Sequence, residues 1–572
     1  MSEPSVSSPA SSTPTTAAPA LLRHLPRWLA ALGGLGWLLW LGGGGALRPT
    51  HLDWLMREDW AMNAVGWLFF RNAPWELPLG SLPNHFYPYG TSVALTDSIP
   101  WAAVLLKPLS GLLPVDFQYI GPWMGLSFAL MGYFGARLVE TVSPRPVHQV
   151  LGGVLVALAP VLGARFAHPA LTTHWLLVAL LWLNLRGAPD MRTAWQLLAL
   201  AAFFNAVGAG THPYWVAMIF PLTLALGVRL ALSRVLSPVR VAVAVGAIAA
   251  MDALLFSAFG YFSGPGLGAE GFGDFSSDLA TLINPMGWSR LLPALPATPR
   301  QGEGYGYLGT GGLLLVALTL ASVARRFREA RELPWRRVVP ALVVGLALAV
   351  YALSWRVTWL GRPVVDLGGL YAPFAGQTSA FRASGRFIWP LHYLLVCGAL
   401  VLLVRLWRER PAVSATALGL VLALQAYDWR AEQSPLRVPT RFHRMRAPEW
   451  ESLRGTYQHL SLFPPQVQWA CRYEEPLVNA LAYTAYRLKL TFNSGYAARP
   501  PSALIEECHA SLPKEGIAAD TAYVVLPEHL SHFLQAGARC GVLEGLPVCV
   551  AGDKQDAFAQ ALDRSPLQLR SP

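Results

Sequence analysis

Residues 240–261 read RVAVAVGAIAAMDALLFSAFGY, an apolar run in which Asp252 is the single charged side chain after Arg240. A helix of about twenty apolar residues has the length of a bilayer core. Similar apolar blocks lie at 26–47, 117–138, 147–164, 169–186, 194–211, 213–232, 306–324, 338–355, 387–405 and 412–428. The sequence therefore predicts a mainly α, polytopic helical membrane protein of about eleven transmembrane helices.

The composition supports a membrane protein. Of the 572 residues, 53% are hydrophobic and 13% are charged, whereas a soluble domain carries about 25% charged residues. Single soluble cores stop growing near about 250–300 residues, so one core cannot bury this many apolar side chains. The 22 tryptophans fit the membrane–water interface, where indole rings are enriched.

The net charge of +11 does not indicate a nucleic-acid partner, because the arginines cluster in short loops between apolar blocks. Five such loops carry 16 arginines and five acids. Short loops rich in arginine lie on the cytoplasmic side of membranes. This bias predicts a cytoplasmic N-terminus and puts the loops 48–116, 262–305 and 356–386, with the C-terminus, on the outer side.

Two segments allow alternatives. The basic residues 23–27 before the first apolar block could belong to a signal peptide, but no small-residue cleavage site follows, so we interpret residues 1–25 as a disordered cytoplasmic tail before a spanning helix. Residues 98–114 contain Pro100, Lys107, Pro108 and Pro114. We expect an interfacial or re-entrant helix there, because a crossing would invert every later loop.

Residues 430–572 return to a soluble composition and predict a small α/β domain after a transmembrane domain at 26–429. Four of the five cysteines lie here: Cys471, Cys508, Cys540 and Cys549. An even count in an exported domain suggests disulfides. Cys540 and Cys549 flank a predicted hairpin and are the preferred pair, although four cysteines allow three connectivities.

Acids and histidines gather in the outer loops. Asp59, next to Glu58, lies at the start of a stretch, Trp60 to Phe70, that predicts an amphipathic helix on the membrane surface. The helix dipole favours an ionised carboxylate at this position, where it could act as a general base, or could merely cap the helix. His168 and His174 are six residues apart, which is not the spacing of helical zinc ligands. They could equally be polar residues that end two helices, and no divalent metal is predicted.

Arginines in the outer segment 356–386 break the charge bias. Arg382 and Arg386 lie where a spanning helix is expected to begin. Arginine at this depth requires a partner, which could be a lipid phosphate or an acid such as Asp97 or Asp59. The loop 262–305, with Asp274, Asp278 and Glu303, could bind a ligand or be a plain connector.

The order of the outer-face motifs resembles a bacterial integral membrane family related to the GT-C glycosyltransferases. The stretches that carry the resemblance are Glu58-Asp59, Gly66-Trp67, Trp75 to Gly80, Thr96 to Pro100, Arg165 to Trp175, Tyr307-Leu308-Gly309 and Phe381 to Phe387. They begin near residue 26 and run towards the C-terminus, and their order is more specific than any one of them.

This resemblance implies a GT-C-like fold in the bacterial cytoplasmic membrane, with interfacial helices and a periplasmic C-terminal domain. It implies transfer of a sugar from a polyprenyl-phosphate donor to a glycan, lipid or protein acceptor on the outer face. Asp59, with Glu58 beside it, matches the catalytic base, and Asp97 is a second acid. The expected substrate-binding residues are Arg382, Arg386, Lys107, Arg165, His168, His174 and Tyr307.

Two other classes of function remain open. A transporter or flippase of lipid-linked or envelope substrates would place polar residues near the bilayer midplane, where Asp252 is the main acid. A non-catalytic envelope assembly protein would use its C-terminal domain to bind a partner and would tolerate the loss of Asp59.

Overall fold

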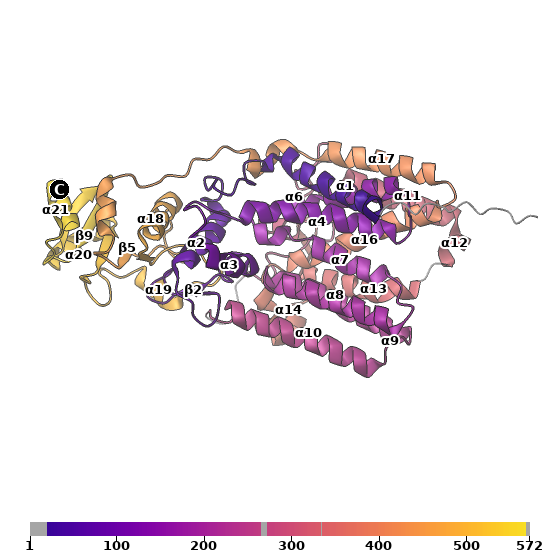
Figure 1. Cartoon of the computed structure of the whole chain (residues 1–572), viewed down its shortest axis with the longest axis horizontal. Coiled ribbons are helices and arrows are strands. Elements are labelled where there is room, and N and C mark those ends of the chain that lie inside the picture. Colours follow the sequence, from indigo (N-terminus) through magenta and orange to yellow (C-terminus); the bar gives the residue numbers. More distant parts are fainter. Residues whose placement is uncertain (1–19, 265–270, 333–334, 568–572) are drawn as a thin grey trace, which may run out of the picture.

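The computed structural model describes residues 20–264, 271–332 and 335–567. Residues 1–19 of the predicted tail lie outside this range, and the first helix, α1 (Ala20–Leu38), begins before the expected boundary at residue 26. The molecule is elongated, with a helical bundle at one end and an α/β region at the other (Figure 1). Short helices of the loop 48–116 lie between the two. We call the bundle end next to the α/β region the outer end, and the loop 48–116 and the segment 356–386 outer by the same definition.

Each of the eleven predicted apolar blocks contains a helix. After α1 these are α4 (Ile120–Glu140), α5 (Pro146–Ala157), α7 (Trp175–Leu185), α8 (Met191–Ala209), α9 (Pro213–Leu232), α10 (Pro238–Phe259), α11 (Gly309–Arg325), α13 (Trp335–Leu353), α16 (Trp389–Leu406) and α17 (Pro411–Asp428). The shorter helix α12 (Phe327–Arg331) lies at the end of the bundle that is far from the α/β region (Figure 1).

Four helical segments of the described chain are long and apolar enough to cross a membrane: Pro213–Leu232, Pro238–Phe259, Trp335–Leu353 and Ser384–Leu406. Three shorter apolar helices occupy Pro146–Ala157, Pro169–Leu185 and Gly309–Arg325. The prediction of eleven transmembrane helices is therefore not supported. Apolar blocks of the right length break into pieces: the block 147–164 divides into α5 and α6 (Pro160–Gly163). The eleven-residue α7 spans only about 16 Å.

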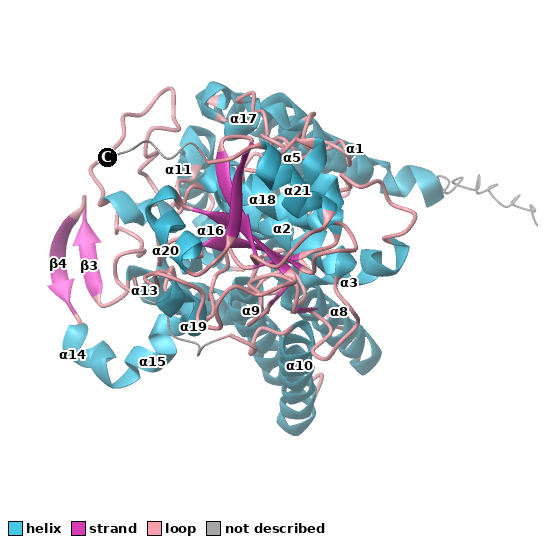
Figure 2. Ribbon diagram, turned by 90° about the vertical axis from the view of Figure 1, so that its left-hand side faces the viewer, coloured by secondary structure: helices cyan, strands magenta, loops and turns pink. Residues whose placement is uncertain are grey.

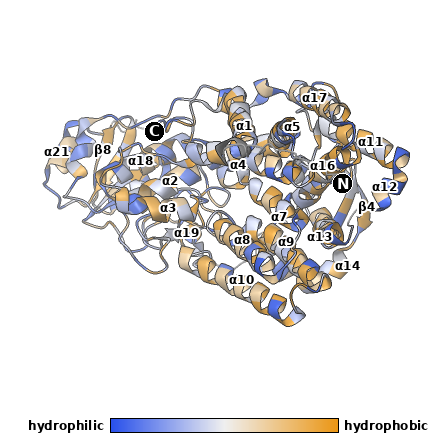
Figure 3. Cartoon of the chain, turned by 45° about the vertical axis from the view of Figure 1, so that its right-hand side comes forward, coloured by the Kyte–Doolittle hydropathy of each residue, from blue (hydrophilic) through white to orange (hydrophobic). Residues whose placement is uncertain are grey.

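The exposed surface of the long helices is apolar. On α10, Val243 and Leu254 are 66% and 71% exposed, and on α13 Val343 is 59% exposed. Figure 3 shows this hydrophobic colouring along the helices of the bundle. Helices that are apolar on their outer faces are suited to lipid rather than water. The bundle is therefore suited to association with a membrane.

Close helix packing in the bundle depends on small residues. A Cβ atom at Gly132 of α4 would lie 2.0 Å from the carbonyl oxygen of Ala30 in α1, and one at Gly153 of α5 would lie 2.6 Å from the carbonyl oxygen of Gly132. Without side chains at these positions the backbones of α1, α4 and α5 approach closely, as small residues allow between membrane helices.

The first outer loop forms α2 (Glu58–Asn72), the short strands β1 (Ser81–Leu82) and β2 (Thr91–Ser92), and α3 (Pro100–Leu106). All residues from Trp60 to Phe70 are buried in protein. The prediction of an amphipathic helix on the membrane surface is therefore wrong, because α2 is covered on every side by the bundle and the C-terminal region. The seven-residue α3 is too short to cross a bilayer.

The outer segment 356–386 forms a hairpin followed by short helices, which project beside the bundle in Figure 2. The elements are β3 (Arg356–Trp359), β4 (Arg362–Asp366), α14 (Gly368–Tyr371) and α15 (Ala375–Thr378). Asp278 of the loop 262–305 accepts hydrogen bonds from the Thr358 hydroxyl at 2.8 Å and the Gly361 N–H at 3.0 Å. This buried carboxylate fixes the hairpin against the loop.

The C-terminal region is α/β, as predicted. Its sheet has the order β6-β5-β7-β9-β8, in which β5 pairs in parallel with β6 and β7, and β9 pairs antiparallel with β7 and β8. The strands are β5 (His459–Phe463), β6 (Thr491–Phe492), β7 (Thr521–Val525), β8 (Arg539–Leu543) and β9 (Leu546–Val550). The helices are α18 (Glu475–Leu488), α19 (Ser502–Glu507), α20 (Leu530–Gln535) and α21 (Ala557–Arg564).

Two disulfides stabilise this region. Cys540 and Cys549 are joined across the β8–β9 hairpin, where they are direct register partners. Cys471 is joined to Cys508 over a separation of 37 residues. Of the three connectivities that the sequence left open, the structure has the one containing the preferred pair. Disulfides form in oxidising compartments, which suits an extracytoplasmic location for this region.

The two ends of the molecule are connected by polar contacts to α2. The Asn72 side-chain amide donates to the Tyr486 carbonyl oxygen, and Arg71 donates to the Tyr486 hydroxyl, both at 2.8 Å. The His85 backbone also bridges to Phe492 at the edge of the sheet. The C-terminal region is thereby held over the outer end of the bundle.

Candidate functional site

The site forms where two 3₁₀ helices, η4 (Pro299–Gly304) and η7 (Ser384–Ile388), cross at the outer end of the bundle. A Cβ atom at Gly385 would lie 2.5 Å from Gly304 Cα, so the crossing requires glycine. The Ser277 hydroxyl lies 3.1 Å from the Gly304 carbonyl oxygen and 3.0 Å from that of Gly385, and connects the two helices. This crossing places Glu303 next to Arg386.

Glu303 binds two arginines through one oxygen. Its Oε2 lies 2.9 Å from Arg165 Nη1 and 2.9 Å from both Nε and Nη2 of Arg386. Burial opposes ionisation of Glu303, but Arg386 and Arg165 outweigh it and hold its pKa well below the usual range. The Arg386 guanidinium also lies over the Tyr214 ring, 4.6 Å from its centroid. Two buried cations therefore share one carboxylate.

His168 connects this ion cluster to Asp59. Its Nε2 lies 3.5 Å from Asp59 Oδ2 and 3.8 Å from Glu303 Oε1. Asp59 is the second residue of α2, and no side-chain hydrogen bond caps that helix. The carboxylate therefore faces His168 and does not cap α2. When His168 is protonated, it can pair with either acid.

Asp97 forms a second acid–histidine contact. Its Oδ1 lies 3.5 Å from His212 Nε2. The Nδ1 of His212 accepts a hydrogen bond from the Tyr214 N–H, so the proton of the neutral ring is on Nε2 and faces Asp97. Burial raises the pKa of Asp97 to about 6, against the opposing effect of the nearby cations. Asp97 can therefore exchange a proton near neutral pH.

A cavity of about 270 Å³ opens beside these groups. Its polar lining includes Asp97, His168, Arg382 and Arg386, and the C-terminal region contributes Tyr496 and Arg499. Its apolar lining includes Phe256, Tyr261, Phe262 and Phe381. Arg382 lies over the Phe275 ring at 5.5 Å and forms no ion pair within the residues that the structure describes. The cavity thus combines cations, one acid and an apolar wall.

Six of the sequence-predicted residues do not line this cavity. Asp59 contacts the lining residue His168, and Arg165 shares Glu303 with the lining residue Arg386. The other four have different surroundings. Glu58 is exposed to solvent. Lys107 donates to the Pro74 carbonyl oxygen at 2.9 Å and lies over the rings of Phe70 and Trp75. His174 is buried with its Nδ1 3.1 Å from the Tyr393 hydroxyl. Tyr307 donates to Asp428 at 2.9 Å.

A comparison with models of protein families identifies the family of this chain. The model described as "Domain of unknown function (DUF6311)" matches residues 30–430. The chain belongs to this family. A second model, described as "DUF6311 C-terminal domain", matches residues 449–551. Every residue of the ion cluster lies within the first match, and Tyr496 and Arg499 of the cavity lie within the second.

No curated protein matches this DUF6311 chain. Among solved structures it is similar to the crystal structure of the Archaeoglobus fulgidus oligosaccharyltransferase in complex with Zn and sulfate, with 13% sequence identity and a TM-score of 0.37. The match covers 82% of this chain and 62% of that chain, so the DUF6311 chain spans less than two thirds of that protein. A TM-score of this size does not establish a shared fold or activity.

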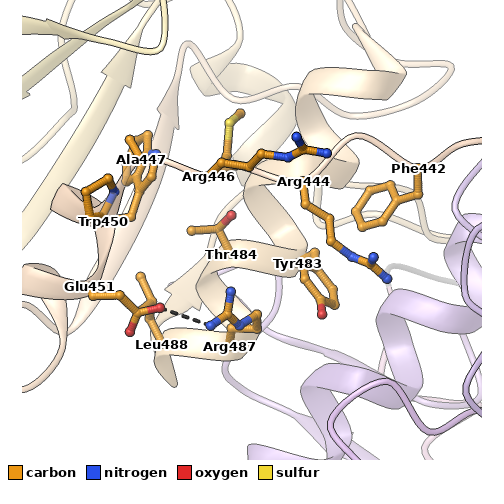
Figure 4. Close-up of a pocket in the computed structure, with 12 residues that line it drawn as sticks. Phe442, Arg444, Arg446, Ala447, Trp450, Glu451, Tyr483, Thr484, Arg487 and Leu488 are labelled. Carbon is orange, nitrogen blue, oxygen red and sulfur yellow. Dashed lines mark hydrogen bonds and ion pairs between the residues drawn. The ribbon is translucent and has the colours of Figure 1, made fainter.

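A second cavity of the DUF6311 chain, of about 380 Å³, lies between α18 and the linker that precedes β5 (Figure 4). Two of its three arginines are paired: Arg487 lies 3.0 Å from Glu451, and Arg444 lies 3.2 Å from Asp116. Asp116 also accepts a hydrogen bond from Tyr483. These pairs connect the linker to α18 and to the first outer loop, and we assign them a structural role.

Sequence reasoning did not assign a role to Glu303, His212 or the residues of the C-terminal region. One signal for Glu303 was available: it is a lone acid in a glycine-rich segment directly before the motif Tyr305-Gly306-Tyr307. His212 precedes Pro213 at the start of a helix, a common N-cap arrangement. Within the described ranges, no group of three His, Cys, Asp or Glu side chains is arranged to hold a metal ion.

Proposed function

We propose that this chain is a membrane glycosyltransferase that moves a sugar from a polyprenyl-phosphate donor to an acceptor at the outer face of the bacterial cytoplasmic membrane. The observation that carries the proposal is the contact of Asp59 with His168 at a cavity lined by Arg382 and Arg386. The Asp59 carboxylate of α2 contacts the cavity through His168, and Arg382, which forms no ion pair within the described residues, lines the cavity beside Arg386. The sequence resemblance to GT-C-related proteins agrees with this arrangement.

The proposed reaction needs both kinds of group. The acceptor hydroxyl oxygen forms a bond to the anomeric carbon of the sugar as the bond from that carbon to the donor phosphate breaks. Asp59 takes the hydroxyl proton, and His168, whose Nε2 lies 3.5 Å from Asp59 Oδ2, positions the carboxylate. The departing phosphate carries the negative charge, which Arg382 and Arg386 stabilise. Asp97, with its pKa of about 6, is the second proton acceptor within the cavity.

Glu303 determines how much positive charge remains available at the proposed phosphate site. In the described structure it engages Arg165 and Arg386 together, so one positive charge of the pair stays uncompensated. Arg382 adds another at the cavity wall. A phosphate monoester or diester would then meet a net positive site of moderate strength. Such a site can bind the donor and still release the product phosphate.

The apolar wall suits the lipid part of the donor. Phe256 and Phe262 at the end of α10 and beyond it line the cavity, and Phe262 is 54% exposed. The adjacent surface of α10 is apolar and exposed, as Leu254 shows. A prenyl chain could therefore leave the cavity directly towards the hydrocarbon core without crossing polar surface.

The test is sugar transfer by the purified full chain in lipid, with labelled polyprenyl-phosphate sugars from the host. We expect Asp59→Asn to lower transfer by about 10²–10⁴-fold, the usual contribution of a general base. Arg386→Ala should lower it by about 10²–10³-fold through lost charge stabilisation. Glu76→Gln and Arg356→Ala remove exposed charges of the same outer face and serve as matched controls.

The outcome separates the classes of function. Loss of transfer in both site variants, with cooperative thermal unfolding retained and active controls, supports the enzyme. Transfer that is untouched by Asp59→Asn while Asp97→Asn abolishes it moves the base to Asp97. No transfer from any donor contradicts the proposal, and normal cellular function of Asp59→Asn in that case favours an assembly protein.

One observation favours a transporter as the second candidate. Asp252 of α10 is 4% exposed, and neither carboxylate oxygen has a hydrogen-bond partner within the described residues. A buried acid within a membrane helix is typical of proton or ion pathways. Movement of a lipid-linked substrate across vesicle membranes that stops on Asp252→Asn, while sugar transfer is undetectable, would support this candidate.

A further inference from the structure

A third cavity, of about 170 Å³, lies at the end of the bundle that is far from the α/β region. It is formed where the start of α13 meets the end of α16, close to the last residue of α7 and the first residues after α4. In Figure 1 this end lies near α12 and opposite the sheet. The cavity is therefore separate from the proposed active site.

Two cations form the rim of this cavity. Arg337 of α13 and Arg405 of α16 line it, and both are exposed to solvent. Within the described ranges neither arginine forms an ion pair. Two acids at this end have other partners: Glu140 pairs with Arg27 and Arg137, and Glu329 pairs with Arg326. Glu332 and Glu409 are exposed and do not line the cavity. The rim therefore presents two positive charges with no carboxylate between them.

The inner wall of the cavity is apolar. Leu185, Val338, Val401 and Leu402 form it, and Trp335 lies at its mouth. Below the cavity the exposed face of α13 continues with Val339, Val343 and Leu346, each at least 48% exposed. A tryptophan at the mouth suits the level of lipid headgroups, where indole rings are enriched. The cavity thus has two arginines at its rim and an apolar wall below them, which matches the charged headgroup and the hydrocarbon chains of a phospholipid.

We propose that this cavity binds one anionic phospholipid, with its phosphate between Arg337 and Arg405 and an acyl chain against Val338 and Leu402. Basic cavities between membrane helices bind acidic lipid headgroups because the arginines pair with phosphate oxygens while the chains stay in hydrocarbon. Free phosphate would use the arginines but not the apolar wall. The lipid would join α13 to α16, both of which lead to the outer site.

The experiment titrates the purified full chain in detergent with dioleoyl phosphatidylglycerol, dioleoyl phosphatidylcholine or inorganic phosphate, with bound lipid counted by native mass spectrometry. The wild type should retain one phosphatidylglycerol in preference to phosphatidylcholine. Arg337→Ala with Arg405→Ala should weaken phosphatidylglycerol binding by about thirtyfold. Arg192→Ala with Arg240→Ala, which removes two exposed arginines at the starts of α8 and α10, should leave it unchanged.

A second variant tests the apolar wall without a change of charge. Leu402→Trp should fill the cavity and displace the lipid while both arginines remain. Equal binding of the two lipids by wild type, or equal loss in the control pair, would overturn the proposal. Displacement of the lipid by millimolar inorganic phosphate would also overturn it, because the occupant would then be a free anion.

Discussion

Two pairs of arginines, one at each end of the helical bundle, have opposite surroundings. At the outer end Arg165 and Arg386 are 6% and 8% exposed and share Glu303. At the other end Arg337 and Arg405 are exposed and form no ion pair within the described part of the chain. An exposed arginine is solvated by water or headgroups, whereas a buried one requires hydrogen-bond acceptors within the protein, here the Glu303 carboxylate. The buried pair therefore marks a built site, and the exposed pair marks a surface that an external anion can reach.

The largest expected change in stability comes from removal of the Glu303 carboxylate, which Arg165 and Arg386 share. Glu303→Gln keeps the shape of the side chain but leaves Arg165 and Arg386 buried without their anion. Breaking a buried ion pair from one side costs about 3–5 kcal/mol. We expect a lower free energy of unfolding by this amount, measured by thermal or denaturant unfolding in detergent.

The matched control for this variant is Glu329→Gln, whose partner Arg326 is near the opposite end. Exposed pairs contribute about 0–1 kcal/mol, so this change should have almost no effect. Equal stability of Glu303→Gln and Glu329→Gln would show that the outer cluster is solvated, and the contrast between the two ends would fail.

Asp97 allows a comparison of two acids within the outer end, because its partner is a histidine, whereas the partners of Glu303 are arginines. Its pKa in the folded chain is about 6, above its ordinary value of 3.8. The folded state therefore favours the protonated form. Stability from this group is fully present below pH about 4 and is lost as the pH rises through 6, by about 3 kcal/mol.

Asp97→Asn should abolish this dependence. Unfolding of the variant and the wild type, measured from pH 4 to pH 8, should show a gap that grows in favour of the variant as the pH rises. Parallel curves over the whole range would mean that Asp97 keeps its ordinary pKa in the folded chain.

Gly385 tests whether the crossing of η4 and η7 positions the arginine. Alanine there would place a Cβ atom 2.5 Å from Gly304 Cα, and such overpacking costs about 1–3 kcal/mol. The shift should also separate Arg386 from Glu303. The measurement is unfolding in detergent, with Gly376→Ala as the control, because a Cβ atom at Gly376 meets no atom within 4 Å.

Much of the helical fold follows from the sequence, because apolar blocks with helical length form helices. The strands of the C-terminal region and its longest helix, α18, also follow from alternation and periodicity. The pairing of Cys540 with Cys549 follows from their position around a hairpin. The number of spans does not follow. Pro160 divides one block, and α2 is buried by protein contacts that no local pattern encodes.

The sequence predicted which residue types form the candidate site, but not which side chains pair with one another. Arg165, Arg386, His168, Asp59 and Asp97 do converge at the outer end, as the motifs suggested. The acid that pairs with the arginines is Glu303, which comes from a loop without periodicity. Lys107 has a backbone carbonyl and two aromatic rings as neighbours, contacts that only the tertiary fold creates.

The smallest expected change in stability is at the other end of the bundle, at Arg337. Arg337→Ala removes an exposed cation that has no carboxylate partner among the described residues, so the free energy of unfolding in lipid-free detergent should change by no more than about 0.5 kcal/mol. Addition of phosphatidylglycerol should stabilise the wild type more than the variant, because a ligand that binds the folded state raises its stability by mass action. A loss of several kcal/mol without lipid would instead mean that Arg337 is held by protein contacts, as Arg165 and Arg386 are, and the two ends would not differ in kind.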